Sequence, residues 1–436
     1  SGMAELLPTV RTVIFDEAHQ LNEIGVQFLG RHLSTGQLLD FVRDLLASGL
    51  QLARGLADWG LCASVLERAS RDLRLCAGRG YPGAKLRWVA EVPEQIEPQI
   101  WRDALAHLSQ ALETVIQALE TVHEIAPDFE RLQERAKALH ESVQNFSKSA
   151  QAATVRWLDV GSQLRLVESP LDIAQAFQEK LFKPDQASDA AKSWIFTSAT
   201  LGDVSGLNWF TEPCGLENAK TLRVKSPFDY PNQAVVYVPK NLPKPSAPGH
   251  SEAVAAMVAR LAQVLGGRTL VLTTTLRALR VISESLQQSL SGVSAIEVLA
   301  QGQMPKRELM ERFRQGADQG HLGHILVPSA SFWEGIDIPG EALQMVVIDK
   351  LPFPPPNDPL VEARASRLEL AGRSAFKDYF IPEAAVALKQ GAGRLIRRET
   401  DSGVLVVCDS RLSSMGYGRS WLAALPPMKL IKTEAE

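Results

Sequence analysis

The sequence lacks the features that mark several protein classes. No apolar run approaches the roughly 20 residues that a membrane-spanning helix needs, and the first residues show no charged-then-apolar signal region. Cysteine is scarce, because Cys62, Cys76, Cys214 and Cys408 are scattered and no two form a C-x-x-C pair. A local zinc or cluster site is therefore not indicated. We expect free thiols in a reducing cytoplasm.

Phosphate-binding and charge signals are also missing. The chain contains no Gly-Lys dipeptide, so it has no loop of the form G-x-x-x-x-G-K-[ST], whose amides and lysine hold nucleotide phosphates. The formal net charge is −4, which gives no support to a nucleic-acid partner. A nearly neutral protein can still bind DNA through a cluster of basic residues.

What is present predicts two or three domains, since roughly 100–200 residues per domain is usual. The apolar run Thr12–Phe15 ends on Asp16, as a buried parallel strand ends on a functional carboxylate. From Leu33 to about Gln151, apolar residues recur at three- and four-residue spacing, which predicts a helical insertion. One stripe in it comprises Leu108, Leu112, Val115 and Leu119. A β-hairpin is expected over Val155–Val167, turning near Gly161.

After the hairpin, strands and helices alternate, which predicts an α/β fold with a parallel, doubly wound sheet. The expected strands are Trp194–Thr197, Ala234–Val238, Thr269–Leu272, His324–Val327, Met345–Ile348 and Val404–Cys408. The expected helices include Glu252–Leu265, Leu276–Leu290 and Pro305–Gln315.

The sequence Asp16-Glu17-Ala18-His19 directly follows the first strand. A strand-end aspartate can hold Mg²⁺ through water, and the adjacent glutamate can orient or deprotonate an attacking water. ATP hydrolysis requires two neighbouring carboxylates with these different roles. The alternative is a solvated acidic loop.

Two further segments carry small hydroxyl or basic residues. Thr197-Ser198-Ala199-Thr200-Leu201 follows a strand and can bond a carboxylate network, although it is also a common turn composition. If Gln390 lies on a helix, Arg394 and Arg397 fall on the same face at i+4 and i+7. Two guanidinium groups there suit a triphosphate, and the alternative is a solvated basic helix end.

The segment Ser329–Gly340 follows the strand His324–Val327. Its hydroxyls and glycine amides can bind phosphate, and Trp333 can stack on a base. Asp337 is positioned to contact a ribose or the arginine pair. For Trp333 the alternative is packing in the core.

The order of these pieces resembles a known family. The sequences DEAH, TSATL, Thr273-Thr274-Thr275, SFWEGIDIPG and QGAGRLIRR occur in the order of motifs two to six of superfamily-two helicases. The helical insertion between DEAH and TSAT resembles the arch domain of the XPD branch. The sequences SFWEGIDIPG and QGAGRLIRR, together with Ser226-Pro227-Phe228, are similar to those of bacterial DinG-family proteins. The resemblance covers essentially the whole chain.

The resemblance implies an ATP-dependent DNA helicase that moves 5′ to 3′ on single strands in DNA repair, in a bacterial cytoplasm at the nucleoid. It implies that Asp16 holds Mg²⁺ through water, Glu17 activates water and His19 links the nucleotide site to the DNA groove. Arg394 and Arg397 would close on the phosphates. The other implied nucleotide contacts are Gly335, Asp337, Gln390 and Gly393. The implied DNA contacts are Thr273, Thr274, Thr275, Ser329, Ser331 and Trp333.

The sequence departs from the family at one point. The family's phosphate loop and its four iron–sulfur cysteines precede the DEAH sequence, and only fifteen residues precede Asp16 here. We therefore expect a partial first RecA-like lobe (1–32 and 152–233), an arch-like insertion (33–151) and a complete second lobe (234–436). An iron–sulfur cluster is expected only in the missing region.

Two other function classes remain to be weighed. A non-catalytic module that binds single-stranded DNA fits the absence of the phosphate loop, and an ATPase assay against longer chains separates the two. A nuclease or deaminase would need clustered metal ligands. The closely spaced His321 and His324 have no cysteine or carboxylate motif beside them.

Overall fold

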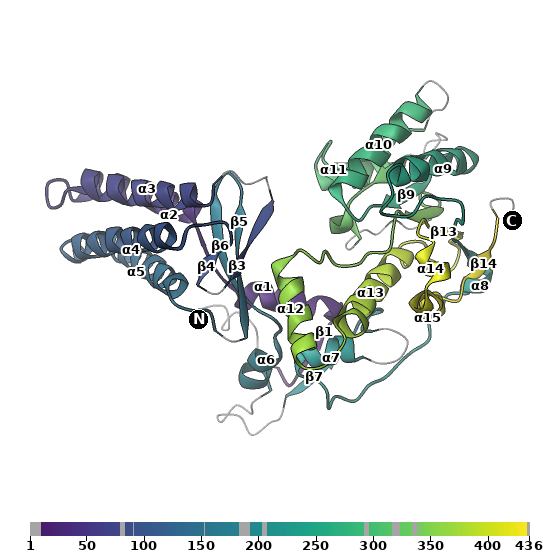
Figure 1. Ribbon diagram of the computed structural model, residues 1–436, viewed down its shortest axis with the longest axis horizontal. Helices are drawn as coiled ribbons and strands as arrows, with labels where there is room; N and C mark the ends of the chain where they lie inside the picture. Colours follow the sequence, from purple (N-terminus) through teal and green to yellow (C-terminus); the bar gives the residue numbers. More distant parts are fainter. Residues whose placement is uncertain are drawn as a thin grey trace.

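The computed structural model describes residues 10–78, 83–89, 91–151, 153–182, 192–202, 207–291, 296–315, 323–333, 338 and 340–433. These residues form an elongated molecule, with a helical layer at one end of the long axis and a large parallel sheet at the other (Figure 1). No helix among them is long and apolar enough to span a membrane. The α/β class predicted from the sequence is confirmed.

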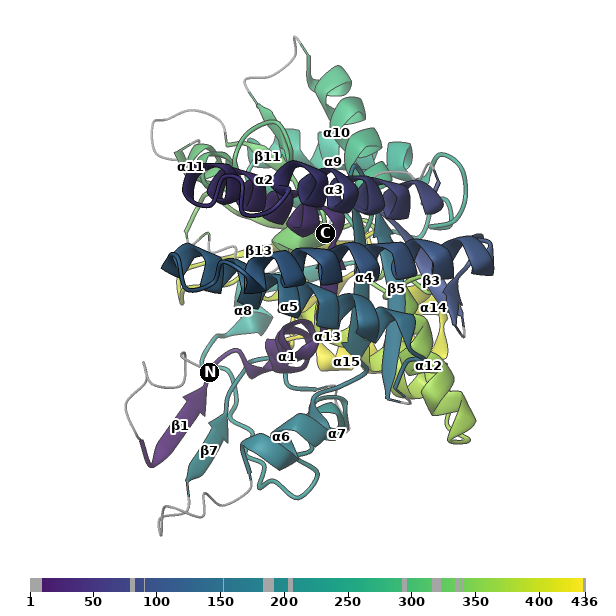
Figure 2. The same ribbon diagram turned by 90° about the vertical axis from the view of Figure 1, so that its left-hand side faces the viewer.

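The first lobe is built on two parallel strands, β1 (Thr12–Phe15) and β7 (Ser193–Phe196), which pair in register along their whole length. They lie side by side although about 180 residues separate them in sequence (Figure 2). The helices α1 (Leu21–Leu29), α6 (Ala174–Lys180) and α7 (Asn208–Cys214) pack near them. The small core of this lobe comprises Ala18, Val26, Ile173, Phe210 and Cys214.

Long helices form a layer within the range where the sequence predicts a helical insertion. They are α2 (Thr35–Leu52), α3 (Trp59–Cys76), α4 (Pro98–Glu120) and α5 (Pro127–Ser147). A capping box between Ser34 and Gln37 starts α2 by satisfying otherwise unpaired amides at the helix start. The leucine and valine stripe of α4 is fully buried against the neighbouring helices, as its spacing predicts.

An antiparallel sheet connects this layer to the lobes. Its order is β2 (Arg31–Ser34), β6 (Leu164–Pro170), β5 (Thr154–Val160), β3 (Ala84–Val89) and β4 (Val92–Pro93). The predicted hairpin is β5–β6, and it closes through a bond from the Gly161 amide to the Gln163 carbonyl. It pairs with β3, so strands from both sides of the proposed boundary at 151 share one sheet.

The second lobe holds a parallel sheet. Its order is β10 (Val298–Ala300), β11 (Ile325–Val327), β9 (Thr269–Leu272), β12 (Met345–Ile348), β13 (Gly403–Val407), β8 (Ala234–Tyr237) and β14 (Lys429–Ile431). The predicted strands agree with the observed ones to within one residue at each end. Continuous apolar runs allow this, because a parallel strand is buried on both faces.

Helices cover both faces of this sheet. One face packs against α9 (His250–Leu265) and α10 (Leu276–Leu290). The other packs against α11 (Lys306–Gln315), α13 (Ile381–Ala392) and α15 (Gly416–Ala424). The remaining helices are α8 (Tyr230–Gln233), α12 (Pro359–Leu370), α14 (Arg411–Ser414) and a short π-helix, Phe376–Phe380. The carboxyl ends of all seven strands therefore meet at one edge, the usual location of a functional site.

Candidate active site at the lobe interface

The DEAH sequence is held by backbone bonds to the neighbouring strand end. The Thr197 amide donates to the Phe15 carbonyl at 2.8 Å, and the Ala18 amide donates to the Thr197 carbonyl at 2.9 Å. Between them, Glu17 adopts a left-handed conformation with φ 49° and ψ 40°. A non-glycine residue in this region is strained, and such strain gathers at functional sites.

Side chains from the two strand ends form one network. The Thr197 hydroxyl donates to Asp16 Oδ1 at 2.9 Å, and the Ser198 hydroxyl donates to Glu17 Oε2 at 3.3 Å. His19 Nδ1 lies 2.8 Å from the Ser198 hydroxyl and 3.3 Å from Glu17 Oε2. The structure thus brings together the DEAH and TSAT residues, which the sequence only suggested were partners.

Exposure differs sharply within this network. Asp16 and Glu17 are exposed, and 65% of the Glu17 side chain is accessible, whereas only 8% of the His19 side chain is. The two carboxylates can therefore reach a metal ion or a water molecule. His19 faces inward and connects the carboxylate to the protein interior.

The second-lobe motif lies at the end of α13, and here one sequence prediction is wrong. The helix ends at Ala392, and Gly393 is its C-cap. The amides of Arg394 and Leu395 then bond three residues back, to the carbonyls of Gly391 and Ala392, in tight turns. Arg394 and Arg397 therefore follow the helix instead of sharing one of its faces, because glycine favours helix termination over continuation.

Asp401 fixes the segment that carries these arginines. Its Oδ2 accepts from the amides of Arg397 and Arg398, both at 2.8 Å, and its Oδ1 accepts from the Gly340 amide at 3.2 Å. Asp401 is 7% exposed. Arg394 donates from Nε to the Trp333 carbonyl at 2.8 Å. The arginines are thus held by specific local contacts rather than by helical periodicity.

Several residues predicted to contact DNA already have structural partners. The Thr273 hydroxyl is fully buried and donates to the Pro328 carbonyl, and the Ser329 hydroxyl donates to Gln301 Oε1. Thr274 bonds Asp349 through both its amide and its hydroxyl. Thr275 is exposed and caps α10 by accepting from the Ala278 amide. Of the three threonines, Thr275 presents the most accessible side chain.

The prediction that Trp333 stacks on a base is not supported. Trp333 is 4% exposed and belongs to the hydrophobic core of the second lobe. Its ring packs under α13, where a Cβ at Gly391 would lie 3.4 Å from Trp333 Cε3. The large apolar ring is more favourably buried than solvated. The backbone of Ser331 is described, but its side chain, Gly335 and Asp337 lie outside the described residues.

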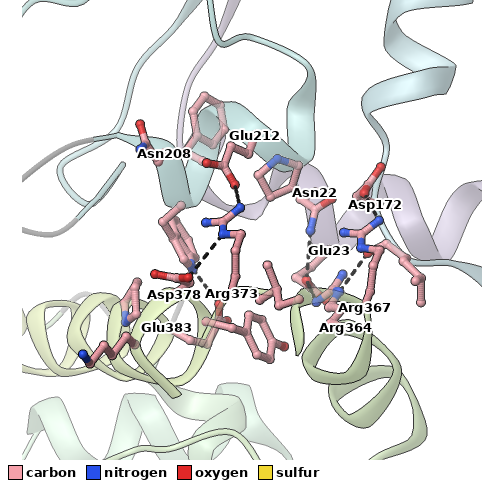
Figure 3. Close-up of a pocket in the computed structure, with 18 of the residues that line it drawn as sticks. Asn22, Glu23, Asp172, Asn208, Glu212, Arg364, Arg367, Arg373, Asp378 and Glu383 are labelled. Carbon is pink, nitrogen blue, oxygen red and sulfur yellow. Dashed lines mark hydrogen bonds and ion pairs between the residues drawn. The ribbon is translucent and has the colours of Figure 1, made fainter. Parts of the chain in front are cut away.

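A cleft of about 500 Å³ separates the two lobes beside His19. The first-lobe helices α1 and α7 form one wall, and α12, the π-helix and α13 form the other (Figure 3). Trp209 donates its indole N–H across the cleft to Glu383 Oε2 at 2.6 Å. Beside it, Lys389 Nζ donates to the Gly202 carbonyl, next to the TSAT sequence, at 2.8 Å.

Sequence reasoning missed the residues that join the two lobes. Arg364, Arg367 and Arg373 extend from the second lobe to acidic residues of the first, and their partners lie 161 to 341 positions away in the sequence. No spacing rule connects residues so far apart. The one available signal was the basic character of 364–373, which is also typical of a solvated helix.

The cysteines stay apart in the fold, and all four are free thiols. Burial raises the pKa of the Cys214 thiol to about 12, so it is held in its neutral form. Within the described residues, no three histidine, cysteine or acidic side chains gather as metal ligands would.

Comparison with known proteins identifies helicases of similar sequence. The family described as Helicase C-terminal domain matches residues 258–428. The ATP-dependent DNA helicase YoaA of Escherichia coli is 35% identical over 429 residues, which cover 98% of this chain and 64% of that protein. The ATP-dependent helicase DinG of Mycobacterium tuberculosis (strain H37Rv) is 36% identical over 264 residues, which cover 59% of this chain and 37% of that protein.

Solved structures agree at the level of the fold. The structure titled XPD_Helicase has a TM-score of 0.56 and 16% identity, covering 99% of this chain and 70% of its own. The structure of S. tokodaii Xpd4 has a TM-score of 0.59 and 18% identity, covering 96% and 75%. The fold of this chain is thus shared with these two XPD structures. The chain is similar to helicases of the DinG/XPD type, and it spans 64% of the length of the YoaA relatives it matches.

Proposed function

We propose that this chain is part of an ATP-dependent DNA helicase that moves 5′ to 3′ on single strands during DNA repair, in the bacterial cytoplasm at the nucleoid. The observation that carries the proposal is the DEAH–TSAT network at the lobe interface, where two exposed carboxylates lie beside a part-buried histidine. In this proposal, 1–32 and 152–233 belong to the first lobe, 33–151 to an arch and 234–436 to the second lobe.

The residues at the end of β1 fit a Mg²⁺ ion held through water. Asp16 is exposed, and its Oδ1 is oriented by the Thr197 hydroxyl and by the Glu17 amide at 3.0 Å. A bound Mg²⁺ would neutralise phosphate charge. Glu17 is accessible and hydrogen-bonded, so it can accept a proton from an attacking water. His19 would transmit changes at Glu17 to the TSAT segment through Ser198.

The second lobe would complete the nucleotide site. We assign Gln390 and Gly393 to the nucleotide side, together with Gly335 and Asp337. Arg394 and Arg397 would stabilise the negative charge that develops on the γ-phosphate. The Lys389–Gly202 contact supports this assignment, because it brings the end of α13 to the segment that follows TSAT.

The DNA strand would cross the carboxyl edge of the second-lobe sheet. Thr274, Thr275 and Ser331 are the proposed contacts, while the buried hydroxyls of Thr273 and Ser329 shape the strand ends. Single strands meet such motors through amides, hydroxyls and basic side chains, so binding needs no large net positive charge.

ATPase measurements test the proposal. The printed chain alone is expected to show no DNA-stimulated ATPase. It contains no glycine-rich loop with a Gly-Lys pair to bind the β- and γ-phosphates. A longer chain that includes such a loop should hydrolyse ATP when single-stranded DNA is added, and Glu17→Gln should abolish the activity. ATPase that survives Glu17→Gln in the longer chain would refute the assigned role.

A second candidate function is a single-stranded DNA-binding module without catalysis. The absence of a Gly-Lys dipeptide from the printed sequence favours it for this polypeptide alone. The two candidates differ in the longer chain, since only the motor hydrolyses ATP there.

A further inference from the structure

Charge is sorted along α12 and the residues that follow it. The start of α12 is acidic where it faces the antiparallel sheet, since Asp358 pairs with Lys85 at 2.6 Å and Glu362 pairs with Arg87 at 2.9 Å. Beyond Glu362 the charge that faces the neighbouring domain is basic. This segment therefore contacts the antiparallel sheet through acidic side chains and the first lobe through basic side chains.

The basic part makes ion pairs with the first lobe. Arg364 pairs with Glu23 at 2.6 Å and Arg367 with Asp172 at 2.5 Å. Arg373 pairs with Glu212 at 2.9 Å (Figure 3). The three acids come from α1, from the turn after β6 and from α7, so the arginines engage separate elements of the first lobe.

Arg364 differs from the other two arginines in its burial. Its side chain is 9% exposed, against 49% for Arg367 and 41% for Arg373. It also donates from Nε to the Leu171 carbonyl at 2.8 Å. Burial disfavours the charged guanidinium, yet Glu23 and Tyr379 raise the pKa of Arg364, so it stays charged. Separation of the lobes would strip it of Glu23 and of the Leu171 carbonyl, which both belong to the first lobe.

We propose that Arg364, Arg367 and Arg373 form an electrostatic clamp that holds the second lobe closed on the first. Arg364 is its anchor, and it also acts as a positioning residue for the DEAH segment, because Glu23 lies one turn after His19 on the helix that continues from DEAH. Arg367 and Arg373 form the outer, solvent-accessible part of the clamp. The clamp concerns the arrangement of the lobes and stands whether or not the chain hydrolyses ATP.

Small-angle X-ray scattering on the full printed chain tests the clamp. Reversal of all three charges, Arg364→Glu, Arg367→Glu and Arg373→Glu, should increase the radius of gyration, because each residue then repels its former acidic partner. The same variant should split thermal unfolding into separate transitions for the lobes. A radius of gyration equal to that of the wild-type chain, with a single transition, would overturn the proposal.

A matched control carries the same change in charge at ion pairs within single helices. The control variant is Arg43→Glu, Arg71→Glu and Arg307→Glu, whose partners are Asp40, Glu67 and Glu311. It should keep the wild-type radius of gyration, and an equal expansion in the control would also overturn the proposal.

A milder variant covers the case in which the triple reversal fails to fold. Arg367→Gln with Arg373→Gln removes only the outer part of the clamp and leaves Arg364 in place. Circular dichroism should remain that of the wild-type chain, while the radius of gyration should increase by less than in the triple reversal. An unchanged radius of gyration in this folded variant would count against the clamp.

Discussion

Glu383 carries a carboxylate placed between the lobes, against the Trp209 indole. Desolvation raises the pKa of Glu383 to about 7, although the Trp209 hydrogen bond and Arg364 oppose the shift. The folded protein therefore holds this proton more tightly than the unfolded chain, where the pKa is 4.5. The resulting stabilisation is complete below pH 4.5 and is lost as the pH rises through 7.

Glu383→Gln should remove this pH dependence, because the amide imitates the protonated acid and still accepts the indole hydrogen bond. Near pH 5 the variant and the wild-type chain should have similar stability. At pH 8 the variant should be more stable by about 3 kcal/mol. Urea unfolding of both proteins at the two pH values measures the difference. Burial also raises the pKa of Asp349 to about 6, but Asp349 is present in both proteins and contributes equally to their pH dependence. A difference that does not change with pH would contradict the prediction.

Trp333 is expected to matter for stability rather than for DNA affinity. Trp333→Leu should lower the free energy of unfolding by about 2–4 kcal/mol, because the core around α13 would be left underpacked. DNA affinity per folded molecule should not change, whereas loss of a stacking contact would cost ~1–3 kcal/mol per base. The exposed Arg280→Ala provides the opposite pattern as a control, with lower affinity and unchanged stability.

At the scale of elements, hydrogen bonds to Asp401 hold the segment after α13, where the sequence predicted that the helix continues. Asp401→Ala should lower the stability of the second lobe by about 2–3 kcal/mol, because the part-buried amides of Gly340, Arg397 and Arg398 lose their shared acceptor. Asp58→Ala, which removes an exposed cap from α3, should cost only about 1 kcal/mol. Thermal unfolding compares the two variants, and equal losses would mean that the Asp401 contacts contribute no more than a surface cap.

The regular elements were predictable because their signals are local. The strands Thr269–Leu272 and Met345–Ile348 and the helix Leu276–Leu290 match their predicted bounds, since apolar runs and helical spacing lie within each segment. The end of α13 was not predictable in this way, because it depends on Gly393 and on the carboxylate of Asp401, four residues beyond Arg397.

The candidate site was predictable only in part for a related reason. DEAH and TSAT were recognised as sequences, but their pairing depends on strands about 180 residues apart. The role of Trp333 required knowledge of what packs above it. The interlobe arginines carry only the weak signal of a basic stretch, because an ion pair is specified by the fold and not by spacing.

At the scale of the whole molecule, the second lobe retains an exposed basic surface. Arg277 and Arg280 lie on α10 just after the exposed Thr275. We expect the printed chain to bind a labelled single-stranded oligonucleotide at micromolar or weaker affinity, falling as salt rises, since phosphate contacts release counterions. Fluorescence anisotropy at several salt concentrations measures this.

Arg277→Glu with Arg280→Glu should weaken this binding and flatten its salt dependence. Loss of two phosphate contacts lowers the slope of log affinity against log salt by about 1.4 for single strands. Reversal of Arg68 and Arg71, on the helical layer, is a control for overall charge. Undetectable binding of the wild-type chain at low salt would mean that the second lobe does not bind the DNA strand at this surface.

The position of β8 has a consequence for how the chain is made. This strand lies between β13 and β14, yet β13 begins about 165 residues later in the sequence. At roughly 5–20 residues per second, a ribosome needs on the order of 10–30 s to supply that partner. During this interval the apolar strand Ala234–Tyr237 waits without either neighbour. Synthesis of β13 and β14 thus decides when the second-lobe sheet can form around β8, and a nascent chain halted before Gly403 would expose an unpaired strand to aggregation.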